Sequence, residues 1–391
     1  MALLMITGGM TTTPTDSMEA MLNLPPLYIS IEGEAIMDNY RSQISELKEI
    51  RNLEDNKLNI KSEKEPILQI KISDHMKTQL NLQPKFLVDI PNRERWKRKD
   101  LMFKGYDSIW YTDGSKTSTG VGLGVYGYNT KLYISLGQYM TIFQAEMLAI
   151  ISCVEKLLEE KVNNVNILIC SDSQAVLKAL KKDSCKSSLT RDCFVKLNEL
   201  ANTNKVVLCW IPGHCGLEGN EIVDGLAKKG AESVLIGPEP FTGISLGTAK
   251  YGKKKWIHES SINYWKNAPR LRQSKVTMYQ PEKEREKMLM SLNRKQLRIV
   301  TMLLTGHGIF KNHLHKMKLA DDKLCRFCNN SNETSLHLIC FCRRFEYYRC
   351  ILFGDIIIQP SYLHDYSFKE LMLFFKLSGL ISTLVKIGSK H

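Results

Sequence analysis

Short apolar strands alternate with amphipathic helices through the middle third of this sequence. Three apolar runs with turns between them predict three consecutive short strands, and the stretch Phe143–Lys161 that follows has apolar residues at helical spacing. The predicted strands are Ile109–Tyr111, Gly120–Tyr128, Leu132–Leu136, Val165–Cys170 and Val206–Ile211, and the later predicted helices are Ser173–Leu180, Leu189–Ala201 and one that begins near Gly219 or Asn220. This order of elements predicts an α/β fold in which helices cover the faces of one sheet.

Four acidic residues lie at the ends of these predicted elements. Asp113 ends the first strand and Asp172 follows the fully apolar strand Ile167–Cys170, so both stand at carboxyl ends of strands, where open α/β sheets place their sites. Glu146 opens the amphipathic helix, and Asp224 lies one turn into the last helix. A single acid at any of these positions is more often a helix cap or a solvated charge. Their joint positions favour one shared site.

The sequence around these acids resembles the type 1 ribonuclease H family. Four blocks match the motifs of that family, and they occur in the family's order. The blocks are Thr112-Asp113-Gly114-Ser115, Gln144-Ala145-Glu146, Ser171-Asp172-Ser173-Gln174, and the segment from Gly213-His214 to Asp224. The resemblance implies a ribonuclease H-like mixed five-stranded sheet flanked by helices. It also implies an endonuclease that hydrolyses the RNA strand of RNA/DNA hybrids.

The resemblance further implies the roles of five catalytic residues. Asp113, Glu146, Asp172 and Asp224 are expected to bind two Mg²⁺ or Mn²⁺ ions, and His214 to assist proton transfer or product release. Clustered carboxylates repel each other, so their ionised state persists only when cations neutralise them, and oxygen ligands suit Mg²⁺. Two such ions roughly 4 Å apart activate a water molecule and stabilise the leaving oxygen. The expected product carries a 5′-phosphate.

Contacts with the hybrid are also expected from the resemblance. Gly114, Ser115, Gln174 and Asn220 are the expected substrate-binding residues. Contacts with 2′-hydroxyl groups in a wide, shallow minor groove would select RNA over DNA. The family often has a polar residue four positions before the catalytic glutamate, whereas this chain has Ile142. That departure puts one contact with the hybrid in doubt and leaves the catalytic set intact.

Two other functions compete with a hybrid-cutting enzyme. One is a catalytically silent remnant that only binds nucleic acid, and the retention of all four acids and of His214 argues against it. The other is a transposase or exonuclease of the same fold, which the block from Gly213 to Asp224 disfavours.

Positive charge is unevenly distributed along the chain. The region Ser108–Glu232 contains 13 Lys+Arg and 13 Asp+Glu, which gives no net charge. The stretch Lys250–Arg298 contains 14 Lys+Arg and 4 Glu, which gives a net charge of +10. Such a stretch either holds a phosphate backbone or forms solvated helix faces. Both interpretations stay open.

The first hundred residues contain no catalytic constellation. Ile6–Thr15 and Leu22–Leu27 resemble the segment between polymerase and ribonuclease H in insect non-LTR retrotransposon proteins. Nothing in the chain supplies the polymerase, so the resemblance implies the C-terminal part of such a protein or a host gene derived from one. A charged, helix-like stretch is predicted at Met37–Asn56, and the basic run Arg93–Lys99 is expected to link to the next domain.

Cysteine and histidine gather near the other end of the chain. Cys325 and Cys328 form a Cys-x-x-Cys pair that is followed by His337 and Cys342, and retrotransposon proteins of the same kind have a similar tail. Thiolates and imidazole at these intervals suit tetrahedral Zn²⁺. Cys340 is an alternative fourth ligand. The competing interpretation is a set of buried thiols with a surface histidine, although an intracellular Cys-x-x-Cys is more often a metal or redox site.

Three further patterns are weighed against simpler structures. Gly122–Gly127 fits a dinucleotide-binding fingerprint, but a turn and a strand follow it rather than a helix, so we interpret it as a glycine-rich strand. Ala320–Asp322 lacks the aromatic residue and apolar strands of a polymerase hairpin and is predicted to be a turn. The apolar run Phe374–Val385 is predicted to be a docking or core helix.

Four segments are therefore expected along the chain. They are a connection-like segment at 1–100, a ribonuclease H domain at 101–235, a basic helical linker at 236–300 and a zinc-knuckle-like helical region at 301–391. The apolar residues at the start are too few to span a bilayer, and no basic segment precedes them. We expect an intracellular protein of the nucleus or cytoplasm, without a secretion signal or a membrane partner. Protein partners stay unknown.

Overall fold

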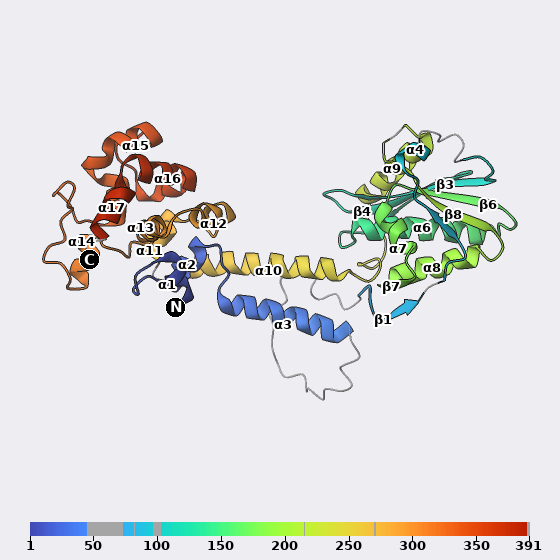
Figure 1. Cartoon of the computed structure of the whole chain (residues 1–391), viewed down its shortest axis with the longest axis horizontal. Coiled ribbons are helices and arrows are strands. Elements are labelled where there is room, and N and C mark those ends of the chain that lie inside the picture. The colour runs from blue at the N-terminus through green and yellow to red at the C-terminus, as the bar shows by residue number, and fades with distance from the viewer. Residues whose placement is uncertain (45–72, 82, 97–102, 215, 270, 389–391) are drawn as a thin grey trace, which may run out of the picture. The chain divides into compact units, whose positions relative to one another are not determined.

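A computed structural model describes residues 1–44, 73–81, 83–96, 103–214, 216–269 and 271–388 (Figure 1). The chain divides into two compact units. The helical unit comprises Met1–Gly33 and Lys255–His391, and the sheet unit comprises Glu34–Lys254. The helical unit combines both ends of the chain, so its boundaries do not correspond to those of the four segments expected from the sequence. The division into four segments stays a prediction. No helix in the described ranges is long and apolar enough to cross a lipid bilayer.

A six-stranded mixed sheet forms the centre of the sheet unit, in the order β2-β8-β6-β3-β4-β5. Strands β3, β4 and β5 form antiparallel neighbours, whereas β6 and β8 run parallel to β3. The strands are β2 (Leu87–Asp89), β3 (Ser108–Lys116), β4 (Val121–Gly127), β5 (Thr130–Ser135), β6 (Asn166–Ser171) and β8 (Lys205–Trp210). The α/β class and the mixed sheet are confirmed.

The predicted number of strands was wrong by one. The additional strand, β2, pairs in parallel with β8 at the edge of the sheet. It has only three residues, so it is too short to show an alternating pattern of its own. Phe86, just before β2, is 3% exposed, and its ring packs edge-on against Phe194 at 5.2 Å between ring centres. The chain before the predicted domain therefore extends its sheet and its core.

Helices cover both faces of this sheet. They are α6 (Ile142–Glu159), α7 (Gln174–Leu180), α8 (Ser188–Leu200) and α9 (Glu218–Glu232). A Cβ atom at Gly124 of β4 would lie 2.6 Å from Val223 O of α9. A Cβ atom at Gly114 of β3 would lie 2.6 Å from Glu146 N of α6. Since Gly114 pairs with Leu123, the neighbour of Gly124, the two helices lie on opposite faces. The glycine-rich strand that we predicted allows α9 to lie directly on the sheet.

A second, two-stranded sheet attaches the segment before β2 to the sheet unit. Strand β1 (His75–Asn81) pairs antiparallel with β7 (Ser184–Ser187). The buried carboxylate of Asp74 accepts hydrogen bonds from Leu189 N at 2.8 Å and from Ser188 Oγ at 3.0 Å. It therefore neutralises backbone donors at the start of α8, as an acidic residue at a helix N-terminus is expected to do.

Short helices build the helical unit. Those that lie wholly within it are α1 (Ala2–Thr7), α2 (Thr15–Met21), α11 (Arg272–Thr277), α12 (Lys283–Met290), α13 (Arg294–Thr305), α14 (Lys311–Lys316), η4 (His337–Phe341), η5 (Arg343–Phe345), α15 (Glu346–Phe353), η6 (Pro360–Asp365), α16 (Phe368–Leu377) and α17 (Leu380–Gly388). Helices α3 (Leu27–Ile44) and α10 (Leu246–Asn267) contribute residues to both units, and α4 (Arg93–Trp96) belongs to the sheet unit. Part of the predicted helical stretch at Met37–Asn56 lies outside the described residues, as does the end of the basic run Arg93–Lys99.

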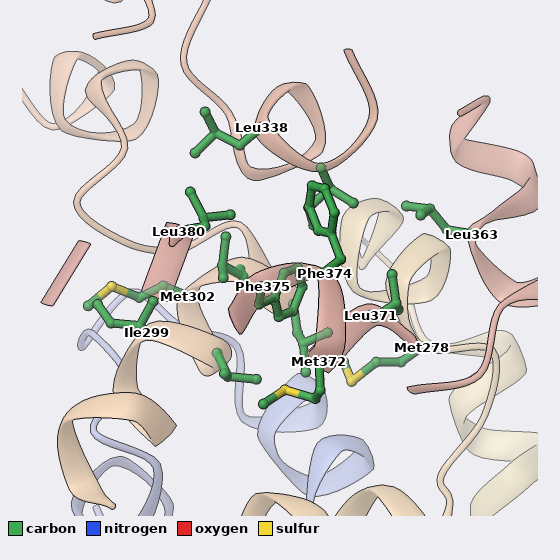
Figure 2. Packing of buried hydrophobic residues seen from close by; sticks show 14 of the residues in the cluster. Met278, Ile299, Met302, Leu338, Leu363, Leu371, Met372, Phe374, Phe375 and Leu380 are labelled. Carbon is green, nitrogen blue, oxygen red and sulfur yellow. The ribbon is translucent and has the colours of Figure 1, made fainter. Parts of the chain in front are cut away.

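The core of the helical unit is apolar and continuous (Figure 2). Phe374 and Phe375 of α16 are fully buried, as are Leu380 and Leu384 of α17. The predicted C-terminal apolar run is thus a core element, although it forms two helices rather than one. Gly379, at φ +68°, separates them because that backbone conformation suits glycine.

Candidate active site and a second ligand cluster

The sheet register brings the acids of two strands to the same edge. Thr112 of β3 pairs in parallel with Ser171, the last residue of β6, so Asp113 and Asp172 follow at equivalent positions. Glu146 lies early in α6, where Gly114 permits the close approach of that helix to β3. Ligand oxygens of Asp113, Glu146 and Asp172 all lie within 4.8 Å of one another. Three of the four predicted acids therefore form one cluster, which we call the carboxylate cluster.

Burial and mutual repulsion make these carboxyl groups hard to ionise. Burial, followed by the charges of Asp172 and Asp224, raises the pKa of Asp113 to about 7. Burial, followed by the charges of Asp113 and Asp172, raises the pKa of Glu146 to about 10. The pKa of Asp172 is raised as well, first by burial and then by Asp224. The cluster therefore stores electrostatic repulsion that a bound cation would relieve.

One oxygen of this cluster has an unmet hydrogen-bonding capacity. Among the described residues, Glu146 Oε2 is buried and has no hydrogen-bond partner. A buried oxygen without a partner is costly, and a metal ion is one of the groups that satisfies it. The donor set contains only carboxylate oxygens, which suits a hard divalent cation such as Mg²⁺ or Mn²⁺.

The fourth predicted acid lies beside the cluster and is paired with a cation. Asp224, in α9, accepts from Lys228 Nζ at 2.6 Å, one helical turn further on. Its charge contributes to the raised pKa values of Asp113 and Asp172. Lys228 was not singled out from the sequence, although its spacing of four residues from an acid is a recognised signal of such a pair.

His214 lies in the loop between β8 and α9. Its backbone φ is +52°, a conformation that is uncommon outside glycine. Its charge lowers the pKa of Asp172, which places the imidazole in the field of the carboxylate cluster. A Cβ at the preceding residue, Gly213, would lie 3.0 Å from Asp172 Oδ2, so the loop passes close to the carboxylate cluster.

The residues expected to contact a substrate differ in accessibility. Ser115 follows Gly114 on β3 and is partly exposed. Gln174 opens α7, and its Oε1 accepts from Lys178 Nζ at 2.9 Å. Asn220, in the first turn of α9, is only 5% exposed, whereas Ile142 is 45% exposed. The structure thus gives Gly114 a packing role and leaves Ser115, Gln174 and Ile142 accessible.

A second ligand cluster lies in the helical unit. One ligand atom from each of Cys325, Cys328, His337 and Cys342 lies within 4.8 Å of the other three. Cys325 Sγ is 3.9 Å from Cys342 Sγ, and Cys328 Sγ is 3.3 Å from His337 Nε2. Cys340 is buried outside this group, and burial raises its pKa to about 12. We call these four residues the sulfur cluster.

A buried acid fastens the turn of the Cys-x-x-Cys pair. Glu333 is fully buried, and its carboxylate accepts from Arg326 Nε at 2.8 Å and from Arg326 N at 2.8 Å. Arg326 lies between the two cysteines of the pair. Oε1 of the same carboxylate also accepts from Lys311 N at 3.1 Å, at the start of α14. The turn is therefore held in one conformation by a paired and hydrogen-bonded charge.

A buried arginine donates to the backbone of one residue of the sulfur cluster. Arg349 is fully buried and donates to the carbonyl oxygens of Cys342 at 2.8 Å and Ile356 at 2.6 Å. No carboxylate in the described part of the chain forms an ion pair with it. Burial lowers its pKa, and the nearby Cys342 and Cys340 thiols act in the opposite sense. Sequence spacing gave no signal for Arg349, because its partners are carbonyl groups.

Comparisons with known proteins agree with this geometry. The family model described as RNase H matches residues 106–232. The chain is similar to human ribonuclease H1, with 30% identity over 156 residues, which cover 34% of this chain and 54% of that protein. It is similar to ribonuclease HI of Haemophilus influenzae, with 30% identity over 143 residues, which cover 32% of this chain and 90% of that protein. Mouse ribonuclease H1 is also 30% identical, over 52% of its length. The chain spans about half the length of the mammalian relatives.

Proposed function

The chain belongs to the RNase H family, through residues 106–232, and from this premise we propose that it hydrolyses the RNA strand of RNA/DNA hybrids. The observation that carries the proposal is the carboxylate cluster. Asp113, Glu146 and Asp172 come from two strands and a helix, yet their oxygens converge within 4.8 Å. The raised pKa values and the unpartnered oxygen of Glu146 support a site shaped for divalent cations.

The proposed mechanism assigns a task to each residue of the site. Two divalent ions, when bound, would supply an activated water molecule and stabilise the leaving oxygen of the RNA strand. Asp113, Glu146 and Asp172 would hold them, and Asp224 would complete the ligand set after release from Lys228. His214, on its loop near Asp172, would move a proton at the leaving oxygen or assist product release. His214 is not among the residues whose ligand atoms converge within 4.8 Å, which supports a role that does not include metal binding.

Recognition of the hybrid would use the accessible surface beside the cluster. Ser115 and Gln174 are the accessible candidates for contacts with the RNA strand, and backbone at Gly114 would contribute where no side chain intervenes. Asn220 would contribute from the first turn of α9. Selection of RNA would follow from hydrogen bonds to 2′-hydroxyl groups, which DNA lacks.

The sulfur cluster is proposed to bind one structural zinc ion. Three thiols and one imidazole match the ligand types and the number of a closed tetrahedral zinc site. Cys342 is the proposed fourth ligand, because its sulfur lies in the cluster and Cys340 lies outside it. We also propose a retrotransposon origin, on the resemblance of the N-terminal segments and of this cysteine-rich tail.

A cleavage assay with the full chain tests the proposed activity. The parent, with Mg²⁺ or Mn²⁺, should cut labelled RNA within a hybrid and spare duplex DNA. Asp113→Asn should abolish cutting, whereas the matched control Asp183→Asn removes an exposed acid of the same unit and should cut like the parent. Equal cleavage by Asp113→Asn and the parent would exclude the assigned role of Asp113. No cleavage by the parent with either ion would favour the silent nucleic-acid-binding remnant.

His214 has its own test. His214→Ala should slow turnover and leave the affinity for the divalent ion nearly unchanged, because the imidazole is not proposed as a ligand. Calorimetric titration with Mg²⁺ measures that affinity directly. A large loss of metal affinity would show that the histidine belongs to the ligand set.

A further inference from the structure

The helical unit contains a pocket, lined by both polar and apolar residues, that none of the functions above uses. Its volume is about 400 Å³, and three short segments supply most of its lining: 271–274 at the start of α11, 305–310 after α13, and 312–316 in α14. Pro14, Glu333 and Thr334 complete the lining. We call it the α11–α14 pocket. It contains no residue of the carboxylate cluster or of the sulfur cluster.

The charge that faces the pocket is positive. Arg272 and Lys316 line it, both side chains are exposed, and neither forms an ion pair with an acid in the described part of the chain. Glu333 is the one acid among the lining residues that the structure describes. Its carboxylate is fully buried and already paired with Arg326, with 2.7 Å between Nη2 and Oε1. Two cations are therefore available to a ligand, whereas the single anion is not.

His307, one of the lining residues, has an imidazole nitrogen without a described partner. His307 Nδ1 is buried and has no hydrogen-bond partner among the described residues. The ring packs edge-on against His313 at 5.1 Å between ring centres. Burial lowers the pKa of His307, and the nearby His313 and Lys316 lower it further. A neutral imidazole has one N–H group, so in one of its two tautomers His307 can donate a hydrogen bond to an anionic ligand.

The wall of the pocket is connected to the sulfur cluster. Glu333 accepts from Arg326 N, inside the Cys-x-x-Cys turn, and from Lys311 N, at the start of α14. The neighbouring Thr334 accepts through its Oγ1 from the backbone N–H of His337, a cluster residue, at 3.0 Å. These bonds link one wall of the pocket to the segments that carry the ligands of the sulfur cluster. Loss of order in that cluster should therefore deform the pocket.

We propose that the α11–α14 pocket binds a phosphate group of a nucleic-acid strand, with Arg272 and Lys316 as cationic contacts and His307 as a further donor. Arginine and lysine are the usual protein contacts to phosphate oxygens, and the volume accommodates a phosphate with its sugar. The choice of a nucleic acid as the source of the phosphate rests on the proposed function. The pocket would then position a strand on the helical unit, separately from the cut.

Binding of a hybrid by the full chain tests the pocket. Fluorescence anisotropy, without Mg²⁺ or Mn²⁺ so that the strand stays intact, is measured across a series of salt concentrations. The double variant Arg272→Met with Lys316→Met should bind at least tenfold more weakly at low salt. It should also lose about 0.9 from the slope of log affinity against log salt, because the pocket holds one phosphate and each duplex phosphate contact contributes about 0.9.

A matched pair of substitutions distinguishes the effect of the pocket cations from that of losing any two positive charges. Lys104→Met with Lys376→Met removes two exposed lysines, one from each unit, that do not line the pocket. This pair should keep the parent's slope. Arg272→Lys, which retains the charge, should stay close to the parent. Equal slopes for the pocket pair and the matched pair would overturn the proposal.

Competition distinguishes a strand phosphate from a free phosphate. Inorganic phosphate should displace the hybrid only weakly from the parent, since one phosphate replaces one contact among several. Calorimetry that finds tight binding of inorganic phosphate alone, with no effect of the pocket pair on hybrid binding, would overturn the strand assignment. Cleavage is measured separately on the same proteins. A parent that binds through the pocket but does not cleave would refute the proposed activity and leave the pocket supported.

Discussion

The two ligand clusters of this chain are built in opposite ways. The carboxylate cluster uses residues in or just after two strands of a hydrogen-bonded sheet and on a helix that packs against it, whereas the sulfur cluster uses residues on turns and a single short helical turn. Residues 317–334, after α14, contain turns and one isolated bridge, Leu324 with Asn332. The sheet therefore imposes the carboxylate cluster, while the ligands of the sulfur cluster must impose the conformation of their own segment. A bound cation should therefore relieve repulsion in the carboxylate cluster, which is already folded, whereas it should be needed for the fold around the sulfur cluster.

The largest effect should follow from removing ligands of the sulfur cluster. In Cys325→Ser with Cys328→Ser, we expect the helical unit to lose its fold, because serine is a poor zinc ligand and structural zinc contributes about 10 kcal/mol or more in small domains. Hydrogen exchange of the full chain, followed by peptide, measures each unit separately. Protection should disappear from α15, α16 and α17 and persist in the strands of the sheet unit.

Cys350→Ser is the control for that experiment, since Cys350 is exposed and lies in the same unit outside the cluster. It should leave protection unchanged. Chelation of the parent should reproduce the double variant. If chelation and the double variant both leave the helical unit protected, and freshly purified protein contains no zinc, the cysteines are ordinary buried thiols.

A smaller effect should follow from the buried charge beside the sulfur cluster. Three thiolates and one imidazole around Zn²⁺ carry a net charge of about −1, which Arg349 would balance at the carbonyl of Cys342. Arg349→Met should destabilise the helical unit by about 3–5 kcal/mol, the usual cost of leaving a buried charge without its partner. Release of zinc to a chelating dye should accelerate in parallel.

A second variant distinguishes the charge of Arg349 from its packing and hydrogen bonds. Combining Arg349→Met with Cys328→His makes the ligand set two thiolates and two imidazoles, which is neutral with Zn²⁺. Zinc release should then be slower than in Arg349→Met with the native ligands. An equal or faster release in the combined variant would show that Arg349 acts through packing and carbonyl hydrogen bonds alone.

The sheet unit should need the cation of the carboxylate cluster only at a pH where the acids of that cluster are driven to ionise. The folded pKa values of Asp113 and Glu146, about 7 and about 10, lie above those of the unfolded chain, so ionisation favours unfolding. Without metal, the two protonated carboxyl groups contribute fully to the stability of the folded state below about pH 4. This contribution is lost as the pH rises through 7 towards 10. Each pH unit over which an acid is ionised in the unfolded chain but protonated in the folded one costs about 1.4 kcal/mol, so we expect the sheet unit to be several kcal/mol less stable at pH 8 than at pH 5.

Denaturant melts followed by exchange in the strands measure this difference. Added Mg²⁺ should reduce it, because the ion binds the ionised carboxylates. The double variant Asp113→Asn with Glu146→Gln should show little dependence on pH and should be more stable than the parent at pH 8 without metal. A parent that gains stability between pH 5 and pH 8 in chelator would contradict the repulsion that we describe.

The sequence predicted the sheet unit better than the helical unit, for physical reasons. Strands such as Val165–Cys170 are buried on both faces and therefore show as continuous apolar runs. Strand β2 escaped prediction because its three residues are ordered by β8 and by Phe86, which the local pattern does not reveal. Asp74 escaped for the same reason, since its partners at Ser188 and Leu189 lie far along the chain.

For the candidate sites too, the sequence predicted what depends on local pattern and not what depends on distant residues. Spacing identified the acids, because strand ends and helix starts bring such residues together. Spacing left Cys340 and Cys342 open, because they are only two residues apart and the irregular backbone decides which sulfur faces the cluster. Arg349 and the α11–α14 pocket depend on carbonyl groups and distant segments, for which sequence pattern has no signature.

The smallest effect should come from Lys228, which pairs with Asp224 at 2.6 Å while its own side chain is 52% exposed. An exposed pair of this spacing contributes only about 0.3–0.5 kcal/mol, so Lys228→Met should leave the stability of the sheet unit nearly unchanged. The substitution removes a cation that competes with Mg²⁺ for the carboxylate of Asp224. Calorimetric titration should therefore show Mg²⁺ affinity rising by about twofold.

Lys229→Met is the control, because Lys229 Nζ lies 4.4 Å from the ring centre of Tyr133 and so points to a different neighbour. That variant should bind Mg²⁺ like the parent. If Lys228→Met weakened Mg²⁺ binding instead, the lysine would be holding Asp224 in the ligand geometry rather than occupying the place of the ion. The sign of this small change thus decides whether the sheet alone positions the carboxylates, as we expect, or needs a charged side chain to do so.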